Sequence, residues 1–142
     1  MHVIYHELLP ESYLLILAPG RPDRQEVVLA RWLRRAQRSG KSAVWVDCGM
    51  LDSLSAEAAR LLWRTHFQLQ EQYAQLVLVH VPERVKRELL EQELGPAPCI
   101  VPTLLDAARQ AHWHDRSPGG VRPSPVPAIS LRAWQWRWSR CR

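Results

Sequence analysis

The sequence predicts a single α/β domain, in which a mixed sheet of about five strands carries about four helices, mainly on one side. Short apolar segments alternate with amphipathic segments of helical period, in the order β-β-α-β-α-β-α-β-α. This alternation is typical of β-α-β crossovers onto a shared sheet. The length of 142 residues allows one domain, and a hydrophobic share of 46% is ordinary for a globular protein.

The first part of the chain predicts a β-hairpin followed by a helix. Residues 2–7 alternate weakly, and residues 11–18 form a stronger apolar segment after a short connection. Over residues 23–38 the apolar positions adopt the period of a helix. We expect Asp23 to cap the start of this helix and Gly40 to end it.

The rest of the chain alternates strands with helices. We expect strands at 42–48, 75–81 and 99–101, and helices at 55–72, 82–94 and 102–111. Ser55 is the expected N-cap of the first of these helices. The strand at 75–81 is almost wholly apolar, which is typical of a strand covered on both faces in a sheet with parallel neighbours.

The net charge of +5 belongs to the end of the chain. Residues 1–112 carry 13 basic and 13 acidic residues, whereas residues 113–142 carry six arginines against Asp115. The latter part is also rich in proline, and it ends in alternating tryptophan and arginine. We therefore expect a folded domain over residues 1–112 and a disordered basic tail over residues 113–142. Such a tail could contact a membrane surface or a nucleic acid.

The compartment is predicted from what the sequence lacks. Its three cysteines form no Cys-x-x-Cys pair, and an odd, sparse set fits a reducing compartment better than a disulfide framework. No apolar run is long enough for a membrane span, and no secretory signal is visible at the start. We expect a cytoplasmic protein, peripheral at the membrane if the tail contacts it.

The common motifs of catalysis and cofactor binding are missing. The triplet Gly40-Lys41-Ser42 precedes a predicted strand, whereas a phosphate-binding loop must open a helix. The six histidines have no cysteine or carboxylate spaced to complete a metal site. Asp47 should raise the pKa of the adjacent Cys48 thiol, which argues against a nucleophile there. We expect no cofactor, metal or small-molecule substrate.

Three carboxylates leave an enzyme open as an alternative. Asp47, Asp52 and Glu57 lie close together in sequence, around one junction between a strand and a helix. Clustered carboxylates can act as general acids and bases or bind Mg²⁺. The other interpretation is a polar loop whose acids cap a helix.

Several short features in register resemble the STAS family, the domains of bacterial anti-sigma-factor antagonists. Residues 46–48 match the family's Val-Asp-Leu strand end, and a helix opens eight residues after Asp47. That helix leads to an apolar strand at 76–79. Residues 82–89 match the pattern Pro-x-x-Val-x-x-x-Leu, and residues 100–107 match a short strand followed by a Thr/Ser-x-x-x-Ala helix.

The resemblance implies a site for a protein partner on the loop 49–55 and the start of the next helix. The residues it assigns to this site are Asp52, Ser53, Leu54, Ser55, Ala56 and Glu57. The family switches partners when a kinase phosphorylates a Ser or Thr directly after a turn Asp. In the ungapped register Ser55 replaces that Asp, and Ala56, which has no hydroxyl, occupies the phospho-acceptor position.

A second register is available, because Asp52-Ser53 imitates the family motif literally. It requires three residues to be deleted before the turn and three to be added to the helix, and insertions avoid the interior of elements. We therefore prefer the ungapped register. Ser53 and Ser55 still place hydroxyls near the site, which leaves phosphorylation open at them.

The function implied by the resemblance is a non-enzymatic protein-interaction module in bacterial signalling. Its expected partner is an anti-sigma factor or a serine-kinase-like protein, bound without a phosphate switch at Ala56. The first alternative is a STAS-type accessory subunit of a membrane transporter or lipid-transport complex, in which the tail contacts the membrane or the transporter. The second is a small enzyme that uses Asp47, Asp52 and Glu57.

Overall fold

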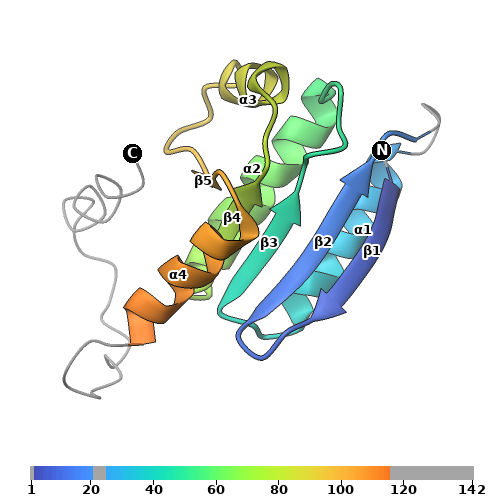
Figure 1. Cartoon of the computed structure of the whole chain (residues 1–142). Coiled ribbons are helices and arrows are strands. Elements are labelled where there is room, and N and C mark those ends of the chain that lie inside the picture. Colours follow the sequence, from blue (N-terminus) through green and yellow to red (C-terminus); the bar gives the residue numbers. More distant parts are fainter. Residues whose placement is uncertain (1, 21–24, 116–142) are drawn as a thin grey trace.

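The computed structural model describes residues 2–20 and 25–115, and within them it contains the nine elements expected from the sequence (Figure 1). Their order is β-β-α-β-α-β-α-β-α, as predicted. The elements are β1 (His2–Leu8), β2 (Ser12–Ala18), α1 (Gln25–Arg38), β3 (Ala43–Asp47), α2 (Ala56–Glu71), β4 (Gln75–Val79), α3 (Glu83–Leu90), β5 (Cys99–Val101) and α4 (Leu104–Asp115).

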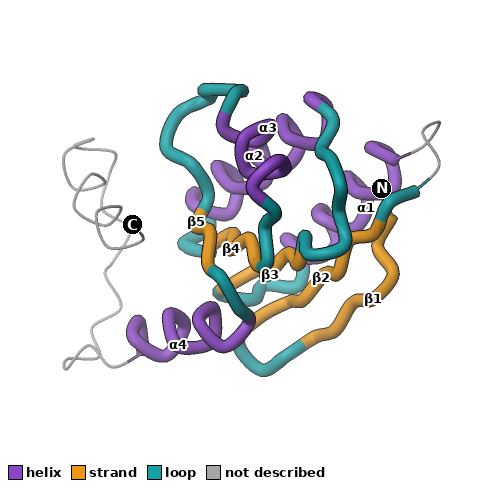
Figure 2. Tube along the Cα trace, turned by 45° about the horizontal axis from the view of Figure 1, so that its top comes forward, coloured by secondary structure: helices purple, strands orange, loops and turns teal. Residues whose placement is uncertain are grey.

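The five strands form one mixed sheet in sequence order, β1-β2-β3-β4-β5, whose strands lie side by side in Figure 2. β1 and β2 form the predicted antiparallel hairpin, and every later neighbour is parallel. In this register Val44 of β3 lies between Tyr13 of β2 and Leu76 of β4. Parallel neighbours require crossover connections, which α1, α2 and α3 provide.

The sheet has a hydrophobic cluster on each face. Val44 and Val46 of β3 join the larger cluster with buried residues of α1, α2 and α3, whereas Ala43 and Trp45 join a smaller one with Ala107 of α4. Figure 1 shows α1 and α2 behind the sheet and α4 in front of it. Three of the four described helices therefore pack mainly on one side, as expected. The apolar strand β4 is buried on both faces, as its composition predicted.

Helix ends differ most from the expectations. The helix expected at 82–94 ends at Leu90, because its buried stripe consists of Val85 and Leu89, and Leu94 beyond it is 48% exposed. The last helix begins at Leu104 and continues to Asp115, past the expected end at 111. None of the described helices is long and apolar enough to cross a membrane.

Other expectations have mixed outcomes. Gly40 follows the end of α1 with a φ of 70°, a left-handed conformation that suits the expected helix stop. The expected N-cap Asp23 lies outside the described residues. So does most of the tail predicted over residues 113–142, and its disorder and its contacts with membranes or nucleic acid stay predictions.

Helix α1 offers a matched test of this packing. Leu29 is fully buried, whereas Val27 in the same helix is 73% exposed. Leu29→Ala should lower the free energy of unfolding by about 2–5 kcal/mol, because it leaves a cavity under the sheet. Val27→Ala should change it by less than about 0.5 kcal/mol. Urea denaturation followed by circular dichroism measures both, and equal losses would contradict the assignment of the buried face.

The larger core contains one titratable side chain on α2. His66 is 1% exposed and contacts the rings of Trp63 and Phe67, with centroid separations of 6.4 and 5.3 Å. Burial lowers the pKa of His66 from 6.5 to about 4, and hydrogen bonding to the backbone of Pro96 acts in the opposite direction. His66 is therefore neutral in the folded protein near neutral pH.

This shift makes stability depend on pH. Between pH 6.5 and about 4 the unfolded chain binds a proton at His66 that the folded chain does not, so stability should fall as the pH falls through this window. At about 1.36 kcal/mol per pKa unit, the contribution is on the order of 3 kcal/mol. His66→Gln should lose this component, which unfolding midpoints between pH 7 and 4 would measure. An unchanged pH slope in that variant would overturn the assignment.

Candidate functional site

The carboxyl ends of β3 and β4 lie together at one edge of the sheet. The two strands are parallel and in register, with Asp47 opposite Val79, so the segments that follow them emerge side by side. The backbone N–H of Cys48 extends this pairing by donating to the carbonyl of Val79 at 2.9 Å. The loop after β3 is the one for which the sequence predicted a partner site.

Two leucines fasten this loop to the core. Leu51 is 4% exposed and Leu54 is 5% exposed, and both belong to the larger cluster. The backbone N–H of Leu51 donates to the carbonyl of Cys48 at 2.9 Å, which closes a tight turn. The burial of two side chains in one short loop fixes its path across this edge of the sheet.

Helix α3 holds the same loop through a carboxylate. The backbone N–H of Leu54 donates to Oε2 of Glu88 at 2.6 Å. Arg84, one turn earlier on α3, donates from Nε to Oε1 of Glu88 at 3.1 Å. One carboxylate oxygen of Glu88 therefore accepts from the loop and the other accepts from Arg84 on the same helix. The contact with Arg84 holds the side chain of Glu88 toward Leu54.

Ser55 begins α2 and ties it to α1. Its Oγ accepts a hydrogen bond from the backbone N–H of Ala58 at 3.1 Å, which confirms the expected N-cap. The same hydroxyl donates to Oε1 of Glu26, in the first turn of α1, at 2.9 Å. Both hydrogen-bonding roles of this side chain are thus used inside the fold, and the start of α2 is fixed against its neighbour.

An Asp-His pair completes the edge. Asp47 accepts from the backbone N–H of Gly49 at 2.9 Å through Oδ1, and its Oδ2 lies 2.9 Å from Nδ1 of His80. A Cβ on Gly49 would lie 3.1 Å from Cβ of His80, so this position leaves little room for a side chain. His80 follows β4 with a φ of 52°, which ends the strand at Val79, two residues before the expected end.

Five of the six residues assigned to the partner site are exposed, namely Asp52, Ser53, Ser55, Ala56 and Glu57. Leu54 is the exception, because its side chain is buried in the core and is closed to a partner. Leu54 therefore anchors the predicted loop to the core through its side chain. Met50 lies within the predicted loop 49–55, although it is not among the six residues assigned individually, and it is 55% exposed.

His80 was missed, because the apolar segment around it predicted an interior strand position. Only the parallel register of β3 and β4 brings His80 to Asp47. No sequence pattern specifies that register by itself, since Asp47 and His80 are separated by the whole of α2.

The three carboxylates of the enzyme alternative are engaged separately. Asp47 pairs with His80 and Gly49, Glu57 lies 3.4 Å from Arg60 on its own helix, and Asp52 is exposed in the loop. Among residues 2–20 and 25–115, no three His, Cys, Asp or Glu side chains are grouped as metal ligands.

Cys48 lies beneath this edge as a structural thiol. Its side chain is 1% exposed, and burial, with a further contribution from the charge of Asp47, raises its pKa to about 12. The direction and the effect of Asp47 agree with the sequence prediction. A thiol with this pKa is protonated at neutral pH and is a poor nucleophile.

Comparisons with known proteins identify the fold. No protein-family model matches the chain, and no curated protein matches it. A point variant of RsbS from Moorella thermoacetica superposes with a TM-score of 0.69 at 13% identity, over 82% of this chain and all of that one. The anti-sigma factor antagonist SpoIIAA in its unphosphorylated form gives 0.59 at 12% identity, over 77% and 96%. The chain has the STAS fold. Part of the longer SLC26A9 chain also matches, with a TM-score of 0.61 at 8% identity, over 73% of this chain and 20% of that chain.

Substitutions of Ser55 and of its neighbour Ser53 test the contribution of the N-cap to stability. Ser55→Ala removes the acceptor for Ala58 and the donor to Glu26, so it should lower the free energy of unfolding by about 0.5–2 kcal/mol. Ser53→Ala, two residues earlier on the exposed surface, should change it by less than about 0.5 kcal/mol. Chemical denaturation compares the two variants, and a larger loss from Ser53→Ala would refute the cap as the dominant role of Ser55.

Proposed function

We propose that this chain is a non-enzymatic STAS-type protein-interaction module in bacterial signalling, and that it binds its partner through residues 49–57, hereafter the docking loop. The fold it shares with SpoIIAA, an anti-sigma factor antagonist, supports this class. The observation that carries the proposal is the contrast within the docking loop between an anchored backbone and exposed side chains. A partner of this class places the protein in the cytoplasm.

The anchored backbone favours binding. Leu51 and Leu54 are buried, and contacts with Glu88 and Glu26 hold the backbone and the cap from two further helices. A loop ordered before it meets its partner loses little conformational entropy on binding. Met50, which is 55% exposed, adds an apolar contact surface among polar neighbours.

The proposed module has no phosphate switch at position 56. Ala56 is the first residue of α2 and has no hydroxyl. The preceding Ser55 uses its hydroxyl to cap the helix and to contact Glu26, and a phosphate there would meet the carboxylate of Glu26. We therefore propose constitutive partner binding with respect to this position. Ser53 and Ser55 are both exposed, and because Ser55 caps the helix we propose Ser53 as the remaining site for modification.

The start of α2 supports the ungapped register. In that register the family's turn Asp corresponds to Ser55, and the structure places Ser55 at the N-cap. In the second register the phospho-acceptor would be Ser53. Ser53 lies two residues before the N-cap and therefore outside the helix. A phosphate acts most strongly on a helix start when it lies within the first turn.

The accessory-subunit alternative also keeps a supporting observation. The SLC26A9 match shows the same fold as one part of a longer chain, with a TM-score of 0.61. An accessory subunit of a membrane transporter or lipid-transport complex would use the same docking loop toward a different protein.

A pair of arginine variants on α2 tests the docking loop. Ala56→Arg places a large cation at the proposed interface, whereas Gln68→Arg places the same cation on the exposed surface of the same helix, about 18 Å away. In affinity capture from native lysate with the full chain, we expect the wild type and Gln68→Arg to retain the same partner. Ala56→Arg should reduce its recovery at least about tenfold, as a centrally placed clash does.

The identity of the captured partner and its recovery by each variant separate the two candidate functions. Partners are identified by mass spectrometry, and circular dichroism verifies that both variants are folded. An anti-sigma factor or serine kinase supports signalling, and a transporter subunit supports the alternative. Equal recovery by Ala56→Arg and Gln68→Arg would reject the docking loop as the interface.

A further inference from the structure

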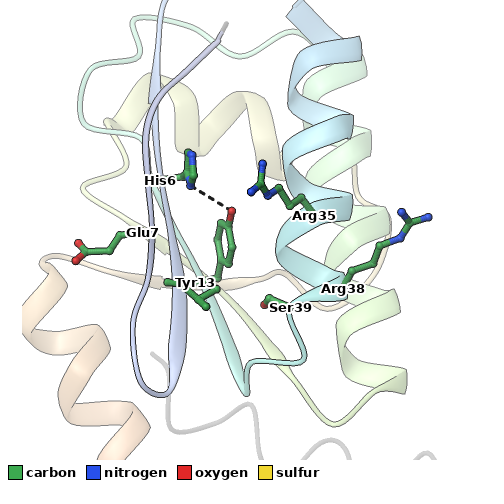
Figure 3. A pocket seen from close by; sticks show the side chains of 7 residues that line it. His6, Glu7, Tyr13, Arg35, Arg38 and Ser39 are labelled. Atoms are coloured by element: carbon green, nitrogen blue, oxygen red, sulfur yellow. Dashed lines mark hydrogen bonds between the residues drawn. The ribbon is translucent and has the colours of Figure 1, made fainter.

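A hollow lies at the β1 edge of the sheet, away from the docking loop. It opens between the β1–β2 hairpin and the C-terminal half of α1, and its volume is about 570 Å³ (Figure 3). Its polar wall consists of His6, Tyr13, Arg35, Arg38 and Ser39. The name anion pocket is used below for this hollow.

Arg35 and Arg38 border the anion pocket, and Figure 3 shows the guanidinium of Arg35 on the side of His6 and that of Arg38 extending away from His6 and Tyr13. Arg35 and Arg38 are exposed, and neither forms an ion pair within residues 2–20 and 25–115. Glu7 also borders the hollow, but Figure 3 shows its carboxylate on the far side of β1, pointing away from both arginines. That carboxylate accepts a hydrogen bond from the hydroxyl of Tyr5 at 2.9 Å. Neither arginine is therefore paired with the carboxylate of Glu7, although Glu7 borders the hollow.

Aromatic rings hold the polar groups in place. The Trp32 ring lies 4.3 Å from the imidazole of His6, centroid to centroid, and 5.3 Å from Cζ of Arg35. A guanidinium over a ring face keeps its N–H groups available in the plane. These contacts limit the freedom of both side chains before any ligand arrives, which reduces the entropy lost on binding.

A buried phenol orients the histidine. Tyr13 is 3% exposed, and its hydroxyl lies 3.4 Å from Nδ1 of His6. When the phenol donates to Nδ1, the imidazole carries its proton on Nε2 and can donate it to a ligand. Ser39 contributes shape more than chemistry, because its hydroxyl already donates to the carbonyl of Ala36.

We propose that the anion pocket binds a phosphate dianion, either free or as the monoester group of a small organic molecule. The planar donors of Arg35 match a pair of phosphate oxygens, His6 can supply a further N–H, and Arg38 adds positive charge at the rim. The C-terminal end of α1 carries a partial negative charge, which opposes an anion. The attraction for phosphate therefore has to come from the arginine side chains.

This site is independent of the docking loop. The pocket lies at the β1 edge of the sheet, two strands away from β3 and about 10 Å across the strands from the end of β3, where the docking loop starts. Loss of phosphate binding would therefore leave the partner test unaffected, and the reverse also holds.

The test is a titration of the full chain at low salt with inorganic phosphate and with phenyl phosphate, followed by calorimetry and amide NMR shifts. We expect saturable binding that shifts the signals of residues 6–8 and 35–39. Arg35→Gln should weaken it about tenfold, the loss typical of one charged hydrogen-bonding partner, and Arg38→Gln should weaken it less because its guanidinium points away from the hollow. Arg34→Gln removes the same charge from the adjacent position outside the pocket wall and should stay within about twofold of the wild type.

The outcomes separate the sources of the phosphate. Tighter binding of phenyl phosphate supports a monoester ligand, and equal binding of both compounds supports free phosphate. No saturable binding of either compound would overturn the proposal. An equal loss from Arg34→Gln and Arg35→Gln would also overturn it, because it would show attraction to the overall charge of α1 rather than to a site.

Discussion

The two-sided burial of β3 is the constraint on which the rest of the structure depends. Its residues from Ala43 to Val46 are all at most 8% exposed, and their side chains alternate between the two clusters. A strand buried in this way must pair on both edges, because unpaired backbone groups are costly away from water. β2 and β4 supply that pairing, both in parallel. Parallel pairing then requires helical crossovers and brings the carboxyl ends of the strands to one edge.

The candidate site is a consequence of that edge. Asp47 at the end of β3 meets His80 after β4 because the strands share direction and register. The docking loop crosses the same edge and is held by parts of the chain far apart in sequence, through Glu26 on α1 and Glu88 on α3. Its geometry therefore depends on the packing of α1, α2 and α3 on one face of the sheet. A change in α1 or α3 would reach the proposed partner surface through these two carboxylates.

The sequence predicted the features that depend on local pattern. The order of elements, the hairpin and the N-cap at Ser55 follow from periodicity and from the hydrogen-bonding ability of a single side chain. Three features needed information that neighbouring residues do not carry. Leu54 looks like a surface residue of a polar loop, and its burial follows from the path of that loop over the core. His80 and the anion pocket require pairs of distant segments to be placed side by side.

The neutrality of residues 1–112 conceals a separation of charge along the domain. Residues 47–57, at the carboxyl edge of the sheet, carry three acids and no basic residue, whereas residues 31–41 carry four arginines and Lys41 without an acid. Helix α1 itself runs from Glu26 in its first turn to Arg35 and Arg38 in its last, which suits the helix dipole at both ends. The dipole explains why such charges are tolerated there, but it does not require them to line a hollow. The same separation gives the two proposed sites opposite preferences, since an acidic edge repels the phosphate that the basic end attracts. Under these two proposals, a phosphorylated ligand and a protein partner would bind at different parts of one small domain.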